Sequence, residues 1–185
     1  MSELDQILAD IESSAATHAV KRNWNPHHQG DIDIRIAADG SWFHQGRRFQ
    51  RDSMVKLFAG ILRREDDGYF LVTPSEKLRI QVEDAPFVAT LVERIEDNDQ
   101  QAIVFTTNIG EQIVVDHEHA IRVDIDADTN EPRPYVHLRD GLDALISRSA
   151  FYDLLNLAEE GERNGIGYLS ITSLGEEFEL GSTDE

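Results

Sequence analysis

A set of short segments occurs twice along the chain in the same order, and this internal repeat restricts the fold more than any other feature. Each copy contains apolar strand-like segments, a glycine, an apolar helical segment and a strand-like segment that begins with Gly-Tyr. Chance can produce one such match, but a full set in register indicates a duplication. Two related halves create a pseudo-symmetric cleft, which is a common place for a ligand. The matched segments are Ile34-Arg35-Ile36 with Ile121-Arg122-Val123, Trp42-Phe43-His44 with Tyr135-Val136-His137, Gly46 with Gly141, residues 51–58 with residues 148–155, and residues 68–73 with residues 167–172.

The pattern of apolar residues predicts an α+β protein in which each half is a helix packed on an antiparallel sheet. Apolar and charged residues alternate in residues 32–36, Asp39-Gly40 supplies turn residues, and residues 41–45 can form the returning strand. This pattern predicts a β-hairpin. Asp84-Ala85-Pro86 then interrupts the chain. The expected organisation is an N-terminal helix at 1–20, a first domain at 21–84, a second domain at 85–180 and a tail at 181–185. Further strands are expected at 69–73 and 78–82, and a meander of antiparallel strands at 87–95, 102–107, 112–115 and 121–125.

Each half is expected to contribute one helix to its core. In the first half the helix begins near Asp52 or Ser53 and ends before Asp66. The repeat aligns Leu57 with Leu154, so we expect both leucines to occupy equivalent buried positions. The apolar stripe of the first helix consists of Met54, Leu57, Phe58, Ile61 and Leu62.

Residues 1–20 form a further amphipathic pattern. Leu4, Ile7, Leu8 and Ile11 recur at helical spacing, and the segment holds four acids and no lysine or arginine. An acidic polar face favours docking onto the body of the protein, or onto a second copy, over lying on a membrane.

Composition narrows the classes of partner and compartment. The chain has 185 residues, no cysteine and a formal net charge of −19, which argues against duplex nucleic acid or a membrane as the main partner. No apolar stretch approaches the roughly 20 residues of a membrane span. No secretory signal is evident, so we expect a cytoplasmic protein. The charge is uneven, at −4 for residues 1–20, +3 for residues 21–79 and −18 for residues 80–185.

Between about Trp24 and Thr172 the chain resembles the proteobacterial family catalogued as domain of unknown function 1285. The resemblance implies a duplicated core, a C-terminal half loosely like a pleckstrin-homology fold, and a site for a small, nucleotide-like ligand at the domain interface, with a role in signalling. It is carried by Leu57-Phe58-Ala59, Leu62-Arg63-Arg64-Glu65, Leu71-Val72-Thr73-Pro74, Val82-Glu83-Asp84-Ala85-Pro86-Phe87, Thr107-Asn108, Pro134-Tyr135 and Arg139-Asp140-Gly141-Leu142.

The basic segment contains the candidate anion site. Lys77 and Arg79 share one face of a predicted strand, and the strand order could bring them near Arg63 or Arg64. Arginines at a helix C-terminus also complement the helix dipole, so a purely structural use of Arg63 and Arg64 stays open. The full set of candidate ligand-binding residues is Arg63, Arg64, Lys77, Arg79, Glu83, Phe87, Asn108, Tyr135 and Arg139, in which Phe87 and Tyr135 could stack a base.

Asp116-His117-Glu118-His119 is the one motif with metal-ligand chemistry. In a strand, His117 and His119 would point to one face and could hold a metal ion together with Asp116. The same residues also fit a polar turn between two strands.

Three functions are therefore open. The leading hypothesis is a non-catalytic module that binds a small anionic ligand, needs no cofactor and signals to a partner protein. The first alternative is a metal-dependent hydrolase that uses Asp116, His117 and His119. The second is a protein-interaction domain without a small ligand, in which the basic half docks against the acidic half. A homodimer is compatible with each of them.

Overall fold

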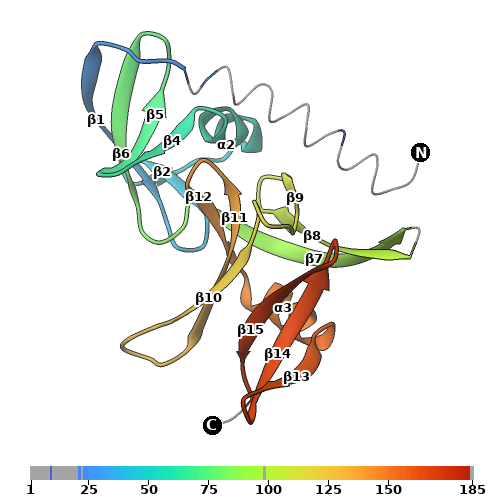
Figure 1. Cartoon of the computed structure of the whole chain (residues 1–185). Helices are drawn as coiled ribbons and strands as arrows, with labels where there is room; N and C mark the ends of the chain where they lie inside the picture. Colours follow the sequence, from blue (N-terminus) through green and yellow to red (C-terminus); the bar gives the residue numbers. More distant parts are fainter. Residues whose placement is uncertain (1–8, 10–20, 22, 98, 184–185) are drawn as a thin grey trace.

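The computed structural model describes residue 9, residue 21 and residues 23–97 and 99–183. The helix expected at 1–20 therefore lies outside the described residues, apart from Ala9. Figure 1 shows the first half in blue to green and the second half in yellow-green to red. The described part of the chain contains no helix with the length and apolar composition needed to span a membrane.

The first half is a six-stranded sheet with one helix. Its strand order is β3-β2-β1-β6-β5-β4, and β1 pairs with β6 in parallel. The sheet is therefore mixed, and the prediction of an antiparallel sheet is wrong. The cause is the connection through α2, after which the chain returns to the far side of β1. The elements are β1 His28–Ile36, β2 Trp42–His44, β3 Arg47–Arg48, α2 Asp52–Ala59, β4 Leu62–Glu65, β5 Gly68–Val72 and β6 Glu76–Val82.

The second half contains a six-stranded sheet, a three-stranded sheet and one helix. The larger sheet has the order β10-β11-β12-β7-β8-β9, with β12 parallel to β7, and the smaller has the order β13-β14-β15. The expected meander is correct only for β7 to β9, because β10 pairs at the opposite edge of the sheet. The elements are β7 Phe87–Asp97, β8 Gln100–Thr107, β9 Gln112–Val114, β10 Ile121–Ile125, β11 Pro132–Arg139, β12 Leu142–Ile146, α3 Arg148–Asn156, β13 Glu159–Arg163, β14 Ile166–Ser173 and β15 Glu176–Ser182.

The two halves are similar element by element, as the sequence repeat predicts. The series β1, β2, β3, α2, β4, β5, β6 corresponds to β10, β11, β12, α3, β13, β14, β15. β10 lies beside β15, as β1 lies beside β6. The hairpin turns also match, since Gln45-Gly46 has φ angles of 48° and 74° and Asp140-Gly141 has 49° and 77°. Two consecutive positive φ values characterise the tight hairpin turn that suits the strand twist. The strands β7 to β9 are therefore an insertion before the second repeat.

The helices differ in the face that they bury. α2 ends at Ala59, and Leu62 opens strand β4, so the predicted helix is too long. Leu57 is 66% exposed whereas Leu154 is fully buried, and the prediction of equivalent burial is wrong for Leu57. α2 turns Phe58 inward instead, where its ring lies 6.3 Å from that of Trp42. α3 packs on β7, and no described element packs as closely on α2.

One hydrophobic cluster extends through both halves. It joins Ile36 and Trp42 of the first half to Phe87, Phe105 and Leu154 of the second. Because the interiors of proteins are close-packed, a continuous core restricts movement of one half against the other.

The difference between the two aligned leucines can be measured directly. Leu154→Ala removes fully buried methyl groups and should lower the free energy of unfolding by about 2–5 kcal/mol. Leu57→Ala, the matched control, should cost clearly less, because no described element covers Leu57. Urea unfolding followed by circular dichroism gives both values, and similar losses for the two variants would contradict the described packing of α2.

Candidate functional site

Asn108 joins the two halves through their backbones. Its Oδ1 accepts a hydrogen bond from the Val88 N–H at 3.0 Å, and its Nδ2 donates to the carbonyl oxygen of Gly40 at 3.3 Å. Gly40 has a φ of 83°, and a Cβ there would lie 2.6 Å from the Asn108 Nδ2. This contact therefore requires glycine in the β1–β2 turn. Asn108 is at the interface, as predicted, but both ends of its amide already bind protein.

Arg139 is a second link between the halves. Its guanidinium forms an ion pair with Glu111 and donates to the carbonyl oxygen of Ala59 at 3.3 Å, at the C-terminus of α2. A cation at this position complements the negative end of the helix dipole. The guanidinium also lies 5.5 Å from the ring centre of Phe87. Phe87 is fully buried, so its ring is part of the core and is closed to a stacked base.

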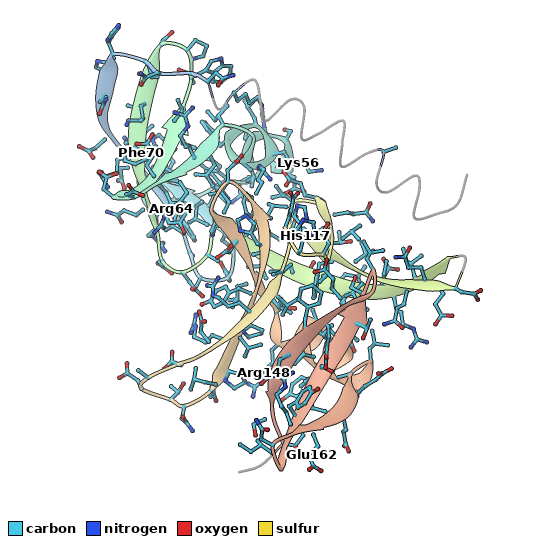
Figure 2. All side chains as sticks on the ribbon, viewed as in Figure 1. Lys56, Arg64, Phe70, His117, Arg148 and Glu162 are labelled. Carbon is cyan, nitrogen blue, oxygen red and sulfur yellow. The ribbon has the colours of Figure 1, made fainter. Side chains whose placement is uncertain are left out.

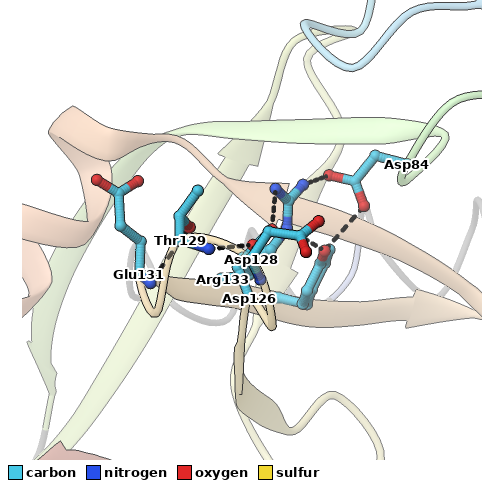
Figure 3. Close-up of polar contacts among 7 residues, drawn as sticks. Asp84, Asp126, Asp128, Thr129, Glu131 and Arg133 are labelled. Carbon is cyan, nitrogen blue, oxygen red and sulfur yellow. Dashed lines mark hydrogen bonds and ion pairs between the residues drawn. The ribbon is translucent and has the colours of Figure 1, made fainter.

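Asp84 and Arg133 belong to a polar network on the connection between the halves (Figure 3), and this network includes Tyr135. The Tyr135 hydroxyl donates to the Asp84 carboxylate at 2.8 Å and accepts from the Arg133 Nε at 3.2 Å. Arg133 also pairs with Asp84 and with Asp126, which caps the β10–β11 turn. Burial raises the pKa of Tyr135, and the hydrogen bond to Asp84 raises it further. The network fixes the linker at Asp84 against β11.

Arg64 has a different environment from these paired groups. It is exposed on β4, its guanidinium carbon lies 4.4 Å above the centre of the Tyr69 ring, and it makes no ion pair with a carboxylate in the described residues. The second half is close, because a Cβ on Gly141 would lie 3.3 Å from the Arg64 Cγ.

Asp84 of the linker and Asp143 of the second half also act on the pKa of Tyr69. Burial raises the pKa of Tyr69, Arg64 opposes this rise, and Asp143 and Asp84 add to it. Asp143 is itself held by Arg122 at 2.8 Å and by the His137 Nδ1 at 2.8 Å. Arg64 and Tyr69 of the first half thus face Asp143, Arg122 and His137 on β10 to β12, and Asp143 contacts the other two groups.

The other predicted cations lie away from Arg64. Lys77 pairs with Glu65 at 2.8 Å, Arg79 pairs with Asp67, and Arg63 donates to the carbonyl oxygens of Lys21 and Trp24. Consecutive residues of a strand point to opposite faces of the sheet, which separates Arg63 from Arg64. Both arginines lie on β4, so the prediction that they complement the dipole at a helix C-terminus is wrong.

Glu83 is also held by contacts within the first half. Its carboxylate pairs with Arg35 and accepts a hydrogen bond from the Ala38 N–H at 2.9 Å. That backbone hydrogen bond and the Arg35 contact lower the pKa of Glu83. Of the nine candidate residues, Arg64, Asn108, Tyr135 and Arg139 lie where the halves meet, with Phe87 buried beneath them.

The histidine motif forms a turn. The Asp116 Oδ1 accepts from the backbone N–H groups of Glu118 and His119 and contacts the His119 Nδ1 at 2.9 Å. His117 is exposed and stands well apart from Arg64 (Figure 2). No group of three or more potential metal ligands occurs among the described residues.

Sequence reasoning missed a second group of cations without acidic partners. A hollow of about 570 Å³ lies beside the start of α2. Its arginines make no ion pair within the described residues. The signal in the sequence is three arginines within a short stretch, Arg47, Arg48 and Arg51. The hollow is lined by His44, Gln45, Arg47, Arg48, Phe49, Gln50, Arg51 and Met54.

Comparison with known proteins places both halves in one family. Residues 20–85 match the N-terminal domain of the domain of unknown function DUF1285, and residues 86–180 match the C-terminal domain of the same family. The crystal structure of a DUF1285 family protein from Silicibacter pomeroyi DSS-3 is similar, with 43% identity, a TM-score of 0.79, and coverage of 91% of this chain and 96% of that chain. A DUF1285 family protein from Shewanella baltica OS155 has 34% identity and a TM-score of 0.53, covering 66% of this chain and 90% of that one. The comparison with curated proteins gave no match. The chain belongs to the DUF1285 family.

The link made by Arg139 leads to a stability prediction. Arg139→Met leaves the Glu111 carboxylate and the end of α2 without their cation, and should lower the free energy of unfolding by about 2–3 kcal/mol. Arg163 forms an exposed pair with Glu179 and is the matched control, because such pairs contribute at most about 1 kcal/mol. Urea unfolding compares the two variants. An equal and small effect would mean that Arg139 does not hold the halves together.

Proposed function

We propose that this protein is a non-catalytic binding module that holds a small, nucleotide-like anion where its two halves meet and signals its occupancy to a partner protein. The observation that carries the proposal is the environment of Arg64. Its guanidinium is exposed, lies over Tyr69, and has no carboxylate partner in the described residues, although it is next to the second half.

The chemistry of this pair suits a phosphate-bearing ligand. A guanidinium offers several N–H donors in a plane and binds phosphate through charge-assisted hydrogen bonds. The same plane stacks on aromatic rings, so a base could extend the stack that Arg64 and Tyr69 begin. Arg122 and Arg133, in contrast, are occupied by Asp143 and Asp84. We therefore assign the principal phosphate contact to Arg64.

A ligand at Arg64 would touch both repeats, whereas one in the hollow beside α2 would touch only the first. This difference favours the interface for a signalling role. The halves share a core and are linked through Asn108 and Arg139, so we expect a ligand to act on the exposed rim of the interface. The likeness of the second half to a pleckstrin-homology fold and the cytoplasmic location remain part of this proposal. Two sheets with one helix in the second half are compatible with that likeness.

One observation favours the protein-interaction domain without a small ligand as the second candidate. Among the nine candidate residues, every cation except Arg64 has a carboxylate or carbonyl partner within the described residues. Such pairing is what a purely structural role of the basic cluster requires. The metal-dependent hydrolase has no comparable observation in its favour in the described chain.

A thermal-shift screen against nucleotides and related anions distinguishes the two candidates. A ligand that binds only the folded state raises the melting temperature. The best hit is then titrated calorimetrically into wild type, Arg64→Met and Arg48→Met, at two ionic strengths.

Arg64→Met should weaken binding tenfold or more, since a charge-assisted hydrogen bond contributes about 1.5–3 kcal/mol. Arg48→Met removes another exposed arginine, which lines the hollow, and should leave the affinity unchanged. Weaker binding at high salt is also expected. A blank screen would favour the interaction domain, and a loss specific to Arg48→Met would move the site to the hollow.

A further inference from the structure

The hollow beside α2 continues into an apolar stripe on the helix itself. Arg47, Arg48 and Arg51 line the hollow together with Met54, which is 42% exposed. Leu57 follows one turn later and is 66% exposed. We call the hollow and Leu57 together the α2 surface. It combines arginines that form no direct ion pair in the described residues with apolar side chains in contact with solvent.

The second repeat shows what covers the equivalent helix. There α3 packs on β7, the strand that begins the insertion before the repeat, and Leu154 is fully buried. Leu57 is aligned with Leu154, yet no described element covers it. In chain order, the counterpart of the insertion is the segment that precedes the first repeat, which is residues 1–20.

The attachment of this segment is fixed at the end of α2. The Arg63 guanidinium donates to the carbonyl oxygens of Lys21 and Trp24, each at 2.9 Å. A Cβ on Gly60, directly after α2, would lie 3.2 Å from the Lys21 Nζ. Lys21, which directly follows residues 1–20 in the sequence, therefore lies beside the end of α2. Even as a helix they could extend roughly 30 Å, while α2 itself is only about 12 Å long.

The composition of the segment complements the α2 surface. It carries four acids, Glu3, Asp5, Asp10 and Glu12, and no lysine or arginine. It also carries the apolar set Leu4, Ile7, Leu8 and Ile11. A small anion would satisfy the arginines but would leave Met54 and Leu57 in water. An acidic amphipathic segment satisfies both.

We propose that residues 1–20 dock in cis on the α2 surface, with acidic side chains at Arg47, Arg48 and Arg51 and apolar side chains over Met54 and Leu57. Tethering at Lys21 keeps the segment at a high effective concentration, of the order of millimolar for a short flexible connection. Modest contacts are therefore sufficient. The arginines of the hollow are then compensated within the chain, and Leu57 is buried as Leu154 is.

The absence of cysteine from the sequence permits a direct test. Leu57→Cys places a single thiol under the docked segment, and its reaction rate with an aromatic disulfide reagent reports how often the segment leaves. The matched control is Tyr152→Cys on α3, because Tyr152 is 56% exposed and lies on the helix of the other repeat. Both are made in the full chain, with and without the pair Ile7→Asp and Ile11→Asp.

Docking in cis predicts that Ile7→Asp with Ile11→Asp accelerates modification of Cys at position 57 tenfold or more, and leaves position 152 unchanged. Arg48→Glu with Arg51→Glu should also accelerate it, although loss of nearby cations by itself disfavours the thiolate. Protection should weaken at high salt. Equal rates in all backgrounds would overturn the proposal. Protection that grows with protein concentration would overturn docking in cis and assign the surface to a second copy.

A measurement without a cysteine avoids any damage that Leu57→Cys does to docking. Amide hydrogen exchange of the wild-type chain should show protection of residues 1–20, and Arg48→Glu with Arg51→Glu should remove it. The exchange of α3 should not respond. Fast exchange of residues 1–20 in the wild type would refute the proposal.

Discussion

The arrangement of this protein depends on the burial of one apolar core by two copies of a repeat. Ile36 and Trp42 of the first copy belong to the same cluster as Phe105 and Leu154 of the second. A small sheet with one short helix buries a smaller share of its surface than a larger domain does, so sharing the interior is favourable. The polar contacts at the junction follow from this burial. Asn108 and Arg139 satisfy backbone groups that would otherwise be left unpaired where the halves meet.

The sequence predicts the repeat and the hairpin turn at Asp39-Gly40 but not the pairing of the strands. Asp39-Gly40 is a local signal, and Gly40 has the positive φ, 83°, that glycine adopts readily. The parallel pairs β1 with β6 and β12 with β7 join distant segments and leave no local pattern. The predicted helix is too long because Ile61 and Leu62 continue a helical spacing, although Leu62 belongs to β4. The buried face of α2 depends on an aromatic contact between Phe58 and Trp42, which only the folded chain reveals.

The contacts of the candidate site, like the strand pairing, cannot be predicted from local sequence patterns. Arg63 and Arg64 are neighbours in the sequence, but consecutive side chains of a strand point to opposite faces of the sheet. Arg63 therefore contacts the chain at Lys21, whereas Arg64 lies at the interface with the second half. The uneven charge of the chain also proved a weak guide. In the described residues, Arg35 with Glu83 is the one ion pair between a cation from residues 21–79 and an acid from residues 80–185, and Glu83 directly follows β6 of the first half. Ion pairs between the basic and the acidic segment therefore contribute little to holding the halves together. The cations of the interface come mainly from the second half and pair with acids there or on the linker.

The two repeats diverge most at the strand that precedes each helix. In the second repeat that strand, β12, is Leu142–Ile146, and it is apolar because β7 pairs with it and closes the sheet. In the first repeat the equivalent strand, β3, is only Arg47–Arg48, and it is an edge. A short edge strand that carries charge resists pairing with another sheet, and this explains why Arg47 stands where the second repeat has the apolar Leu142. The same replacement creates the basic hollow. One difference between the repeats is that a further strand, β7, pairs with β12, whereas β3 has no such neighbour. This difference accounts for the shorter length and the charge of β3, and for the exposure of Leu57 where Leu154 is buried.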